Sequence, residues 1–586
     1  MNKEELRAKF TEIHGNDQEQ LNFILSDENK IIVTAPAGCG KTKAMISKVA
    51  HEIITNEYLN NKRILALTFS VNSAAKIRED IKETLPTLLD RTNYEVDDKL
   101  DVSNYHGFAN RILRKHGYIL HENFKNINDF IRASDFNGGL RNNLVSEEIR
   151  ILEDFDESIK KMDFKAADRL QGSYIDIILT KLVPRNIITY NGILLLAIQI
   201  LDKKTISDFY KLYYQMVIID EFQDTNYLAL QFLKRIVKTN KVILMGDDIQ
   251  KIYGFLGAVP NIFKKMETEY NMFPMEFKTN YRFKDNKNMK QLDSYIRGIF
   301  KNYNNINTYS KTANINFKLF KTDNKEATFL YKDILKYVKL DNKVAILFRA
   351  KYLANDLINI FEKNKLTYFN GLFDDSDPEY IKFHKEALEI FINESGVRKS
   401  ISRTVITNVK GKLNSKKQTI TDNETMFNSL MRLLDALLET TKTKNISTEE
   451  KYEAIIFTLN NNSLKRLMNE INEKVTLTTI HSSKGLEWDY VYLPHMTSFS
   501  FPTSRSLCTL CSRNNGRSVY EKHCKFDFVP GLEKPFFEEL SVLYVALTRG
   551  KKDVFLTANI GPNQHGYNKK VNCFLTLPNF KIIRYF

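Results

Sequence analysis

Short apolar runs recur along the chain, and most of them end in Gly, Asp or Thr and lead into a helical pattern of apolar and polar positions. Such runs are typical of buried parallel strands whose carboxyl ends carry functional loops. They are Ile31–Thr34, Ile64–Thr68, Met216–Asp220 and Val242–Met245 in the first half of the chain, and Val344–Phe348, Val475–Ile480, Val491–Leu493 and Val554–Leu556 in the second. The pattern predicts two α/β halves, each built on a parallel sheet.

Two polar, helix-patterned stretches with few strand signals lie between these runs, and we interpret them as helical insertions, at 116–212 and 375–473. The expected first domain therefore comprises 1–115 and 213–290, and the expected second domain comprises 291–374 and 474–586. Within the second insertion, the basic run Val397–Gln418 is open to two interpretations, an ordinary solvated surface or a surface that faces DNA.

Composition narrows the class of protein. The chain has 586 residues, 43% hydrophobic and 27% charged, and a net charge of +15. These values predict a folded multidomain protein that binds a polyanion, although the charge alone would also suit a membrane surface. No apolar signal segment opens the chain, Ile193–Leu201 is too short to cross a bilayer, and the five cysteines are few and odd in number. We therefore expect a soluble, cytoplasmic protein.

The first run leads into a loop of small residues that ends in Gly40-Lys41-Thr42. Backbone N–H groups of such a loop can surround a β-phosphate, the lysine reaches the β- and γ-oxygens, and the threonine hydroxyl can ligate Mg²⁺. Ala35 stands where the general pattern has glycine. The candidate nucleotide-binding residues are Ala35, Pro36, Ala37, Gly38, Cys39, Gly40, Lys41, Thr42 and Lys43.

An acidic pair, Asp220 and Glu221, follows the apolar run at Met216. At the end of a strand, Asp220 would hold Mg²⁺ and Glu221 could accept a proton from the attacking water. An acidic helix cap would account for the pair alone, but not for the phosphate loop upstream. The two motifs together predict binding of ATP or GTP with Mg²⁺.

An ordered series of motifs from Gln20 to Arg549 is similar to that of the UvrD/Rep family of superfamily 1A helicases. The motifs are AxxGxGKT at Ala35, LALTFSVNSAAKIRE at Leu65, YHGFANRIL at Tyr105, DEFQDTN at Asp220, GDDIQKIYGFLGA at Gly246, NYR at Asn280, ILFRA at Ile346, TTIHSSKGLEWD at Thr478 and YVALTRGKK at Tyr544. The resemblance implies two RecA-like motor domains, with ATP in the cleft between them and single-stranded DNA crossing both.

The resemblance also implies roles at the adenine. Gln20, fifteen residues before Ala35, corresponds to a family glutamine that reads adenine. An amide suits this role because its donor and acceptor can pair with adenine N6 and N7, which favours ATP over GTP. Tyr281 resembles the family tyrosine that stacks on the base.

Other implied contacts concern the phosphates and the sugar. Arg282 and Arg549 resemble the two arginines that reach the γ-phosphate, where a positive charge can raise the rate by ~10³ to 10⁵. Gln250 corresponds to the residue that senses the γ-phosphate and relays its state to the DNA. Glu487 corresponds to a contact with the nucleotide sugar. Hydrolysis is therefore expected to depend on closure of the two domains.

Aromatic and basic residues within the motifs are candidates for a DNA track, because aromatic rings under bases give sequence-independent grip. The candidates for stacking or track lining are Phe69, Tyr253, Phe255 and Trp488, and those for phosphate or motif-linking contacts are His106, Arg349 and His481. The alternative reading is a core aromatic for the first group and a buried, satisfied histidine for His106 and His481.

Two departures from the family pattern stand out. The third motif has Phe255-Leu256-Gly257 where the family usually has Trp-Arg-Gly, so no charged contact is expected from Leu256. Gly550 stands where alanine is common, which we expect to be harmless.

A cysteine cluster lies between the last two motifs. Cys508, Cys511, His523 and Cys524 have a spacing compatible with a structural Zn²⁺ in a Cys₃His site. Adjacent residues seldom both reach one metal, so His495 or Cys573 is an alternative fourth ligand. The other interpretation is unliganded loop cysteines.

The function expected from the resemblance is an ATP-driven single-stranded DNA translocase and helicase that moves 3′ to 5′. Its expected partners are single-stranded DNA, junctions of single- and double-stranded DNA and a nuclease or repair factor, with no membrane. The alternative is a DNA-sensing ATPase subunit of a nuclease-containing complex, for example in antiphage defence, with little unwinding of its own. A nucleotide-gated binder without turnover is disfavoured because every expected catalytic position is filled.

Overall fold

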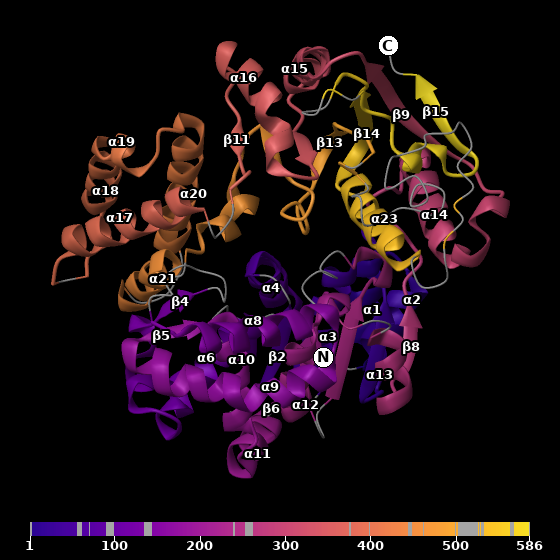
Figure 1. Cartoon of the computed structure of the whole chain (residues 1–586). Coiled ribbons are helices and arrows are strands. Elements are labelled where there is room, and N and C mark those ends of the chain that lie inside the picture. Colours follow the sequence, from indigo (N-terminus) through magenta and orange to yellow (C-terminus); the bar gives the residue numbers. More distant parts are fainter. Residues whose placement is uncertain are drawn as a thin grey trace. The chain divides into compact units, whose positions relative to one another are not determined.

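The chain folds as two units, Met1–Arg282 and Phe283–Phe586, which we describe separately (Figure 1). The structure is a computed structural model, and it describes residues 3–55, 61–68, 71–89, 99–133, 143–237, 241–251, 259, 262–373, 377–397, 399–443, 448–460, 462–498, 500–501, 526, 528, 533–562, 566 and 568–584.

A six-stranded parallel sheet forms the centre of the first unit, in the order β3-β2-β6-β7-β1-β8. Its strands are β1 (Lys30–Thr34), β2 (Arg63–Thr68), β3 (Leu100–Asn104), β6 (Tyr214–Ile219), β7 (Lys241–Gly246) and β8 (Phe273–Glu276). Because the strands are parallel, their carboxyl ends lie at one edge of the sheet. The loops that follow β1, β6 and β7 therefore meet there.

Successive residues of the central strands are buried in two different cores. In β1, Ile31 and Val33 belong to one apolar cluster and Ile32 belongs to the other. The same alternation occurs in β2, where Ile64 and Leu65 face opposite clusters. Side chains of a strand point alternately to its two faces, so a sheet covered on both sides needs apolar residues at every position. This is why these strands read as unbroken apolar runs.

Helices cover both faces of this sheet. The cluster of Ile31 is completed by α1 (Lys3–His14), α2 (Gln18–Leu25), α3 (Lys41–Thr55) and α4 (Val71–Leu89). The cluster of Ile32 is completed by α6 (Tyr105–His116), α8 (Ser146–Lys161), α9 (Phe164–Ile177), α10 (Tyr190–Leu201), α11 (Lys204–Tyr213), α12 (Tyr227–Ile236) and α13 (Ile262–Tyr270). Two short strands, β4 (Ile131–Ala133) and β5 (Ile187–Thr189), pair beside the latter group.

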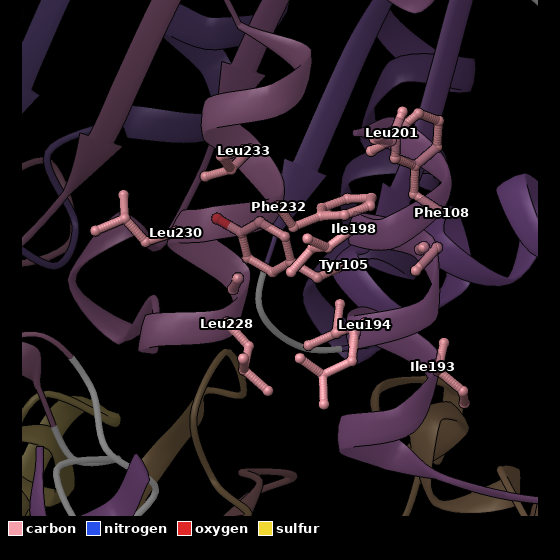
Figure 2. Packing of buried hydrophobic residues seen from close by; sticks show 14 of the residues in the cluster. Tyr105, Phe108, Ile193, Leu194, Ile198, Leu201, Leu228, Leu230, Phe232 and Leu233 are labelled. Atoms are coloured by element: carbon pink, nitrogen blue, oxygen red, sulfur yellow. The ribbon is translucent and has the colours of Figure 1, made fainter. Parts of the chain in front are cut away.

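The apolar run at Ile193 forms the core of α10. Figure 2 shows its side chains packing against Tyr105 and Phe108 of α6 and against Phe232 of α12. Each such buried side chain contributes roughly 1.5–3 kcal/mol of transfer free energy. The predicted insertion at 116–212 is thus helical, but α10 shares a core with the sheet and does not form a separate layer.

The second unit is built on a seven-stranded parallel sheet with the order β11-β12-β10-β13-β14-β9-β15. Its strands are β9 (Ala313–Phe320), β10 (Val344–Phe348), β11 (Phe369–Asn370), β12 (Val475–Thr479), β13 (Trp488–Leu493), β14 (Gly550–Asn559) and β15 (Phe580–Arg584). The helices are α14 (Lys287–Lys301), α15 (Asp323–Val338), α16 (Asn355–Lys363), α17 (Pro378–Ser395), α18 (Arg403–Ser415), α19 (Lys417–Ile420), α20 (Glu424–Thr443), α21 (Thr448–Asn460) and α23 (Glu533–Leu547).

The basic run of the second insertion lies mainly on α18 and α19. Its lysines form ion pairs with carboxylates: Lys410 with Asp435, Lys412 with Glu394, Lys416 with Glu386 and Lys417 with Glu424, at 2.5–2.6 Å. Exposed pairs of this kind contribute at most about 1 kcal/mol each to stability, but they balance the charge of four of the seven basic residues of the run. The structure therefore favours the interpretation as a solvated surface.

The predicted fold class, two parallel-sheet α/β motor domains with helical insertions, is confirmed, and all eight predicted strands are present. The apolar runs did not indicate β3, β4, β5, β8, β9, β11 or β15. In the part of the chain that the structure describes, no helix has the length and apolar character that a bilayer crossing requires.

Candidate nucleotide site and DNA contacts

The phosphate loop connects β1 to α3 and contains two glycines with left-handed backbone, Gly38 (φ +82°) and Gly40 (φ +71°). A Cβ atom at Gly38 would lie 2.5 Å from Arg282 Cβ, and one at Gly40 would lie 2.8 Å from Gln20 Nε2. Both positions therefore require glycine for its backbone freedom and for the close approach of neighbours. Ala35, by contrast, is fully buried in the core, so the departure from glycine is accommodated.

The loop presents the N-terminus of α3, whose first N–H groups have no partner within the helix. Ala44 N–H donates to Gly40 O at 2.9 Å, which places the first helical bond at the end of the loop. Thr42 and Lys43 lie in the first turn of α3, beside Lys41. The predicted phosphate cradle is thus assembled at the carboxyl edge of the sheet.

Lys41 reaches the acidic pair that follows β6. Its Nζ lies 3.3 Å from Asp220 Oδ1 and 3.0 Å from Glu221 Oε1. Burial alone disfavours the charged lysine, but the two carboxylates outweigh this effect and raise the pKa of Lys41 above its usual value. The ammonium is therefore positively charged at neutral pH.

Asp220 is suited to a cation. It continues the ladder of β6, because its N–H donates to Leu67 O at 2.8 Å, and its carboxyl is buried. Apart from the ion pair with Lys41, Oδ1 accepts no hydrogen bond from the residues that the structure describes. Burial raises the pKa of Asp220, with Glu221 acting in the same direction and Lys41 opposing both. A buried carboxylate oxygen of this kind fits the oxygen ligands that Mg²⁺ prefers.

A chain of polar contacts leads from Lys41 to Gln250. Gln223 Nε2 donates to Glu221 Oε2 at 2.5 Å, and Gln223 Oε1 accepts from Asp247 N–H at 3.1 Å. Asp247 Oδ2 in turn accepts from Gln250 Nε2 at 2.9 Å. The chain thus links the ends of β6 and β7, which are neighbours in the sheet.

The packing at Gly246, the last residue of β7, brings Gln223 into this chain. A Cβ atom there would lie 2.1 Å from Gln223 Oε1. Beside the chain, burial and the Asp247 carboxylate raise the pKa of Asp248 to about 6. Sequence reasoning did not assign roles to Gln223 or Asp247, although both lie within quoted motifs.

Gln20 lies against the phosphate loop from α2. Its Nε2 donates to Cys39 O at 2.9 Å, and its Oε1 forms a hydrogen bond with His14 Nδ1. His14 Nε2 continues to Ser47 Oγ at 2.8 Å, and burial lowers the pKa of His14. An amide has a second N–H and a second lone pair, so these contacts orient Gln20 and leave capacity for a base.

The NYR segment closes around the other side of the loop. Asn280 Nδ2 donates to Ala37 O at 3.0 Å, and Tyr281 N–H donates to Gly38 O at 2.8 Å. The Tyr281 ring is 40% exposed, and its hydroxyl donates to Asp17 Oδ2 at 2.6 Å. Asp17 also caps α2. Sequence reasoning missed the roles of Asp17 and Asn280, for which the only signal was an N-cap aspartate before Gln20.

In the second unit, Arg549 is buried and 3% exposed. It donates to Val545 O at 3.0 Å, to Leu486 O at 3.3 Å and to Thr548 Oγ1 at 3.1 Å. The neighbouring Glu487 lies 3.6 Å from Lys551 Nζ. Arg549 and Glu487 are thus brought together, and both belong to loops at the amino ends of β13 and β14.

Gly550 stands where alanine is common in the family. A Cβ atom at this position would lie 2.7 Å from Asp553 O and 2.8 Å from Val554 Cγ2. The local turn of this chain therefore fits glycine beside Arg549, and the expectation that this glycine is harmless stays a prediction.

The structure describes only some of the candidates for the DNA track. Phe69, Tyr253 and Phe255 lie outside the described residues. Burial lowers the pKa of His106 to about 4, and its ring makes an edge contact with Tyr190 at 5.8 Å, so it is neutral at physiological pH. His481 lies in a turn after β12.

Two further candidates for the DNA track, Arg349 and Trp488, make contacts within the second unit. Arg349 makes a two-pronged contact with Glu539, at 2.6 and 3.2 Å. Trp488 is only 7% exposed, at the start of β13. In this conformation the guanidinium is paired with Glu539 and the indole is largely buried. The expected phosphate or motif-linking contact of Arg349 and the expected track-lining role of Trp488 stay predictions.

The candidate zinc ligands Cys508, Cys511, His523 and Cys524 lie outside the described residues. Of the two alternative fourth ligands, Cys573 is a half-buried cysteine, in no disulfide, at the start of a short 3₁₀ helix. His495 Nδ1 instead lies 3.5 Å from Asp323 Oδ1 and 3.7 Å from Glu326 Oε2. The His495 ring therefore lies beside two carboxylates, those of Asp323 and Glu326.

A phosphate loop after β1, with an acidic pair after β6 at the same edge of the parallel sheet, is the arrangement of P-loop nucleotide sites. Residues 16–271 match the UvrD/REP helicase N-terminal domain, and residues 378–560 match the UvrD-like helicase C-terminal domain. The chain belongs to the UvrD/Rep-like helicase family of superfamily 1A.

Curated relatives match along nearly the whole chain. A probable DNA helicase II homolog of Rickettsia conorii is 24% identical over 93% of this chain and 92% of its own length. The DNA helicase II of Rickettsia typhi is 24% identical with the same coverage. A probable DNA helicase II homolog of Mycoplasma genitalium is 22% identical over 96% of this chain and 87% of its own length.

Proposed function

We propose that this protein is an ATP-dependent DNA helicase that moves 3′ to 5′ along single-stranded DNA and unwinds duplexes at junctions. Family membership and the DNA helicase II names of the relatives support this proposal. The observation that carries it is the continuous polar chain from Lys41 to Gln250, because a motor must connect its phosphate site to its DNA contacts.

Binding of ATP changes the partners of Lys41. The triphosphate offers the ammonium a stronger anion than the two carboxylates, so Lys41 turns to the β- and γ-oxygens. Asp220 Oδ1 and the Thr42 hydroxyl are then free to hold Mg²⁺, which neutralises charge on the phosphoryl oxygens. Glu221, released from Lys41, accepts the proton of the attacking water.

The base and the sugar are recognised by residues around the loop. The spare N–H and lone pair of Gln20 pair with adenine, and the exposed Tyr281 ring stacks on it. Glu487 is proposed to contact the sugar. Arg282, whose backbone already contacts Gly38 O at 3.3 Å, and Arg549 are proposed to stabilise the γ-phosphate in the transition state.

Arg549 must change its hydrogen bonds to do so. Val545 O, Leu486 O and Thr548 Oγ1, three of its acceptors, are neutral oxygens of its own unit, and each of these bonds is weaker than one to a phosphate. A phosphate that competes for this guanidinium would therefore favour a rearranged second unit. This requirement couples the chemical step to movement.

The DNA side of the coupling begins at Gln250. When Glu221 exchanges Lys41 for another partner, the hydrogen bond that Gln223 donates to Glu221 changes. Gln223 also contacts Asp247, and Asp247 contacts Gln250, so the change reaches Gln250. Tyr253 and Phe255 follow within five residues of Gln250 and are proposed to stack on bases. The other residues of the proposed track are Phe69, His106, Arg349, His481 and Trp488, of which Arg349 and Trp488 would have to change their present contacts.

A strand-displacement assay tests the proposal. Duplexes with a 3′ tail, a 5′ tail or blunt ends are incubated with protein and ATP, and the released strand is quantified. We expect release from the 3′-tailed duplex alone. Release only from the 5′-tailed duplex would overturn the polarity, and no release together with no DNA-stimulated hydrolysis would overturn the helicase assignment.

Nothing in the comparisons favours the alternative of a DNA-sensing subunit of a nuclease complex. DNA-stimulated hydrolysis without strand release, in a protein that copurifies with a nuclease, would point to it. The candidate zinc site likewise stays a proposal. Metal analysis of purified protein with less than about 0.2 zinc per chain would remove it.

A further inference from the structure

A basic groove of about 580 Å³ lies on the second unit, between α14 and the segment that leads into β9. Its polar lining residues include Lys287, Lys290, Gln291 and Ser294 on α14, and Ser310 and Lys311 on the opposite wall. The four helix residues have the spacing i, i+3, i+4, i+7, so they lie on one face of α14. The groove belongs to none of the sites described above.

The three lysines of this groove are exposed, and none forms an ion pair with a described residue. This differs from α18 and α19, whose lysines are matched by carboxylates. The only acidic residue of α14, Asp293, accepts from Tyr544 at 2.6 Å and lies 3.5 Å from Arg297, away from the groove. The positive charge of the groove is therefore uncompensated.

The groove walls are fixed to each other. Gln291 Nε2 donates to Thr312 O at 3.1 Å, which ties α14 to the opposite wall. At the base, Tyr295 is buried, donates to Pro578 O at 2.7 Å and stacks on Phe580 at 5.3 Å. The ammonium groups and the hydroxyls of Ser294 and Ser310 are thus presented on a rigid support.

The residues that line the groove favour the binding of a sugar–phosphate backbone. Single-strand sites combine basic residues with aromatic faces for the bases, whereas the aromatic ring at this groove, Tyr295, is buried and already stacked. Ammonium and hydroxyl donors bind phosphate oxygens, and without a stacking face they give no grip on unpaired bases. Duplex DNA offers twice the phosphate density of one strand, so it is the better partner for closely spaced lysines.

We propose that this groove binds the phosphate backbone of duplex DNA, as a second contact besides the single-strand track. The inference rests on the proposed helicase function, since it places the duplex ahead of the motor against the second unit. Lys287 and Lys290 lie one helical turn apart and contact neighbouring phosphates, while Lys311 contacts the backbone from the other wall.

The test compares two triple variants of the full chain. K287Q/K290Q/K311Q removes the groove charge, and K325Q/K332Q/K339Q removes three exposed lysines on and beside α15 as a matched control. Glutamine removes the charge and keeps the helix propensity of lysine, with a side chain that is one atom shorter. Affinity for a blunt 20-base-pair duplex and for a 20-nucleotide single strand is measured without ATP over a range of salt concentrations.

For the groove variant, we expect the slope of log K against log salt on duplex to fall by roughly 2 to 3, because each lysine that neutralises a phosphate contributes about 0.9. Duplex affinity at 0.1 M salt should fall at least about tenfold. Single-strand affinity and single-strand-stimulated ATP hydrolysis should match those of wild type and of the control variant.

Equal slopes for the groove and control variants would overturn the proposal. Equal losses on duplex and single strand would overturn the duplex assignment and place the groove on the single-strand path. Both outcomes are distinct from failure of the proposed function, which would show as absence of DNA-stimulated hydrolysis in wild type.

Discussion

Lys41 and Arg549 are both cations at loops of a parallel sheet, but their surroundings differ. Lys41 is half-buried and lies between the carboxylates of Asp220 and Glu221, whereas Arg549 is buried and donates to two backbone carbonyls and to the Thr548 hydroxyl. A cation between carboxylates is balanced in charge and ready to exchange partners with a triphosphate. A guanidinium that donates to these internal acceptors is fixed in direction and must leave them to reach a phosphate.

The first unit is therefore closer to the arrangement that binds ATP than the second unit is to the arrangement that supports hydrolysis. The first unit already brings together the loop, the acidic pair, Gln20 and Tyr281. The second unit holds its arginine inside. If ATP binding needs only the first unit and hydrolysis needs both, substitutions in the two units should separate binding from turnover.

The largest effect is expected for Arg549→Ala. Loss of a charge on the transferring phosphoryl group should lower DNA-stimulated ATP hydrolysis by ~10³ to 10⁵. Because the phosphate loop is in the first unit, binding of a fluorescent ATP analogue should persist. Thermal unfolding serves as the control for folding, since the variant also loses three internal hydrogen bonds. Loss of nucleotide binding in a folded variant would contradict the division of roles.

Glu221→Gln should lower hydrolysis by ~10² to 10⁴, the usual contribution of a general base. The amide keeps the shape of the side chain, so ATP binding should be retained or strengthened. Steady-state hydrolysis and nucleotide titration measure the two effects separately. An exposed acid, Glu83, provides the control as Glu83→Gln, which should behave as wild type. A Glu221→Gln enzyme with normal turnover would exclude Glu221 as the base.

Gln20→Ala should reduce the preference for ATP over GTP. A two-pronged amide contact with adenine contributes about 1–3 kcal/mol, so discrimination should fall by roughly 5- to 150-fold. The measurement is kcat/KM for both nucleotides. His14→Ala should have a smaller effect in the same direction, because it only orients the amide. Unchanged discrimination in both variants would show that the base is read elsewhere.

The smallest expected effects concern the pH dependence of the free energy of unfolding. Burial lowers the pKa of His106 in the first unit and of His384 in the second to about 4. The unfolded histidine titrates near pH 6.5, so the unfolded state takes up protons first as the pH falls. The free energy of unfolding therefore decreases as the pH falls from 6.5 towards 4. At pH 5 the loss is about 2 kcal/mol per histidine.

His384→Gln should flatten this dependence for the second unit alone. In the native state, His384 Nδ1 donates to Tyr380 O at 2.8 Å and Nε2 accepts from Leu464 N–H at 3.2 Å, which defines a neutral ring. Thermal unfolding at pH 7.5 and pH 5 gives the measurement. An equal pH dependence in wild type and variant would mean that the buried ring is not the group that titrates.

Most of the central sheet could be predicted from sequence, because its strands are buried on both faces and read as unbroken apolar runs. Four of the strands that were missed, β3, β8, β11 and β15, lie at sheet edges. Edge strands have lower burial, as in β8, where three of four residues are exposed and one is half-buried. β9, next to an edge, alternates buried and half-buried residues, so its sequence carries no continuous apolar signal.

The candidate site was predicted where local motifs carry it. Lys41, Asp220 and Glu221 lie in motifs whose chemistry is readable from the residues themselves. The roles of Gln223 and Asp247 could not be read in this way, because they meet only where β6 and β7 lie side by side. The internal bonds of Arg349, Trp488 and Arg549 likewise depend on tertiary packing that no single motif contains.

The central claim is that Lys41 belongs to an ATP site whose turnover is driven by DNA. Its most direct test is the rate of ATP hydrolysis by wild type and Lys41→Ala, with and without single-stranded DNA, alongside the exposed-lysine control Lys82→Ala. We predict strong stimulation by DNA in wild type and in Lys82→Ala, and none above background in Lys41→Ala. Wild-type hydrolysis that is indifferent to DNA, or a Lys41→Ala variant that retains DNA-stimulated turnover, would contradict the account.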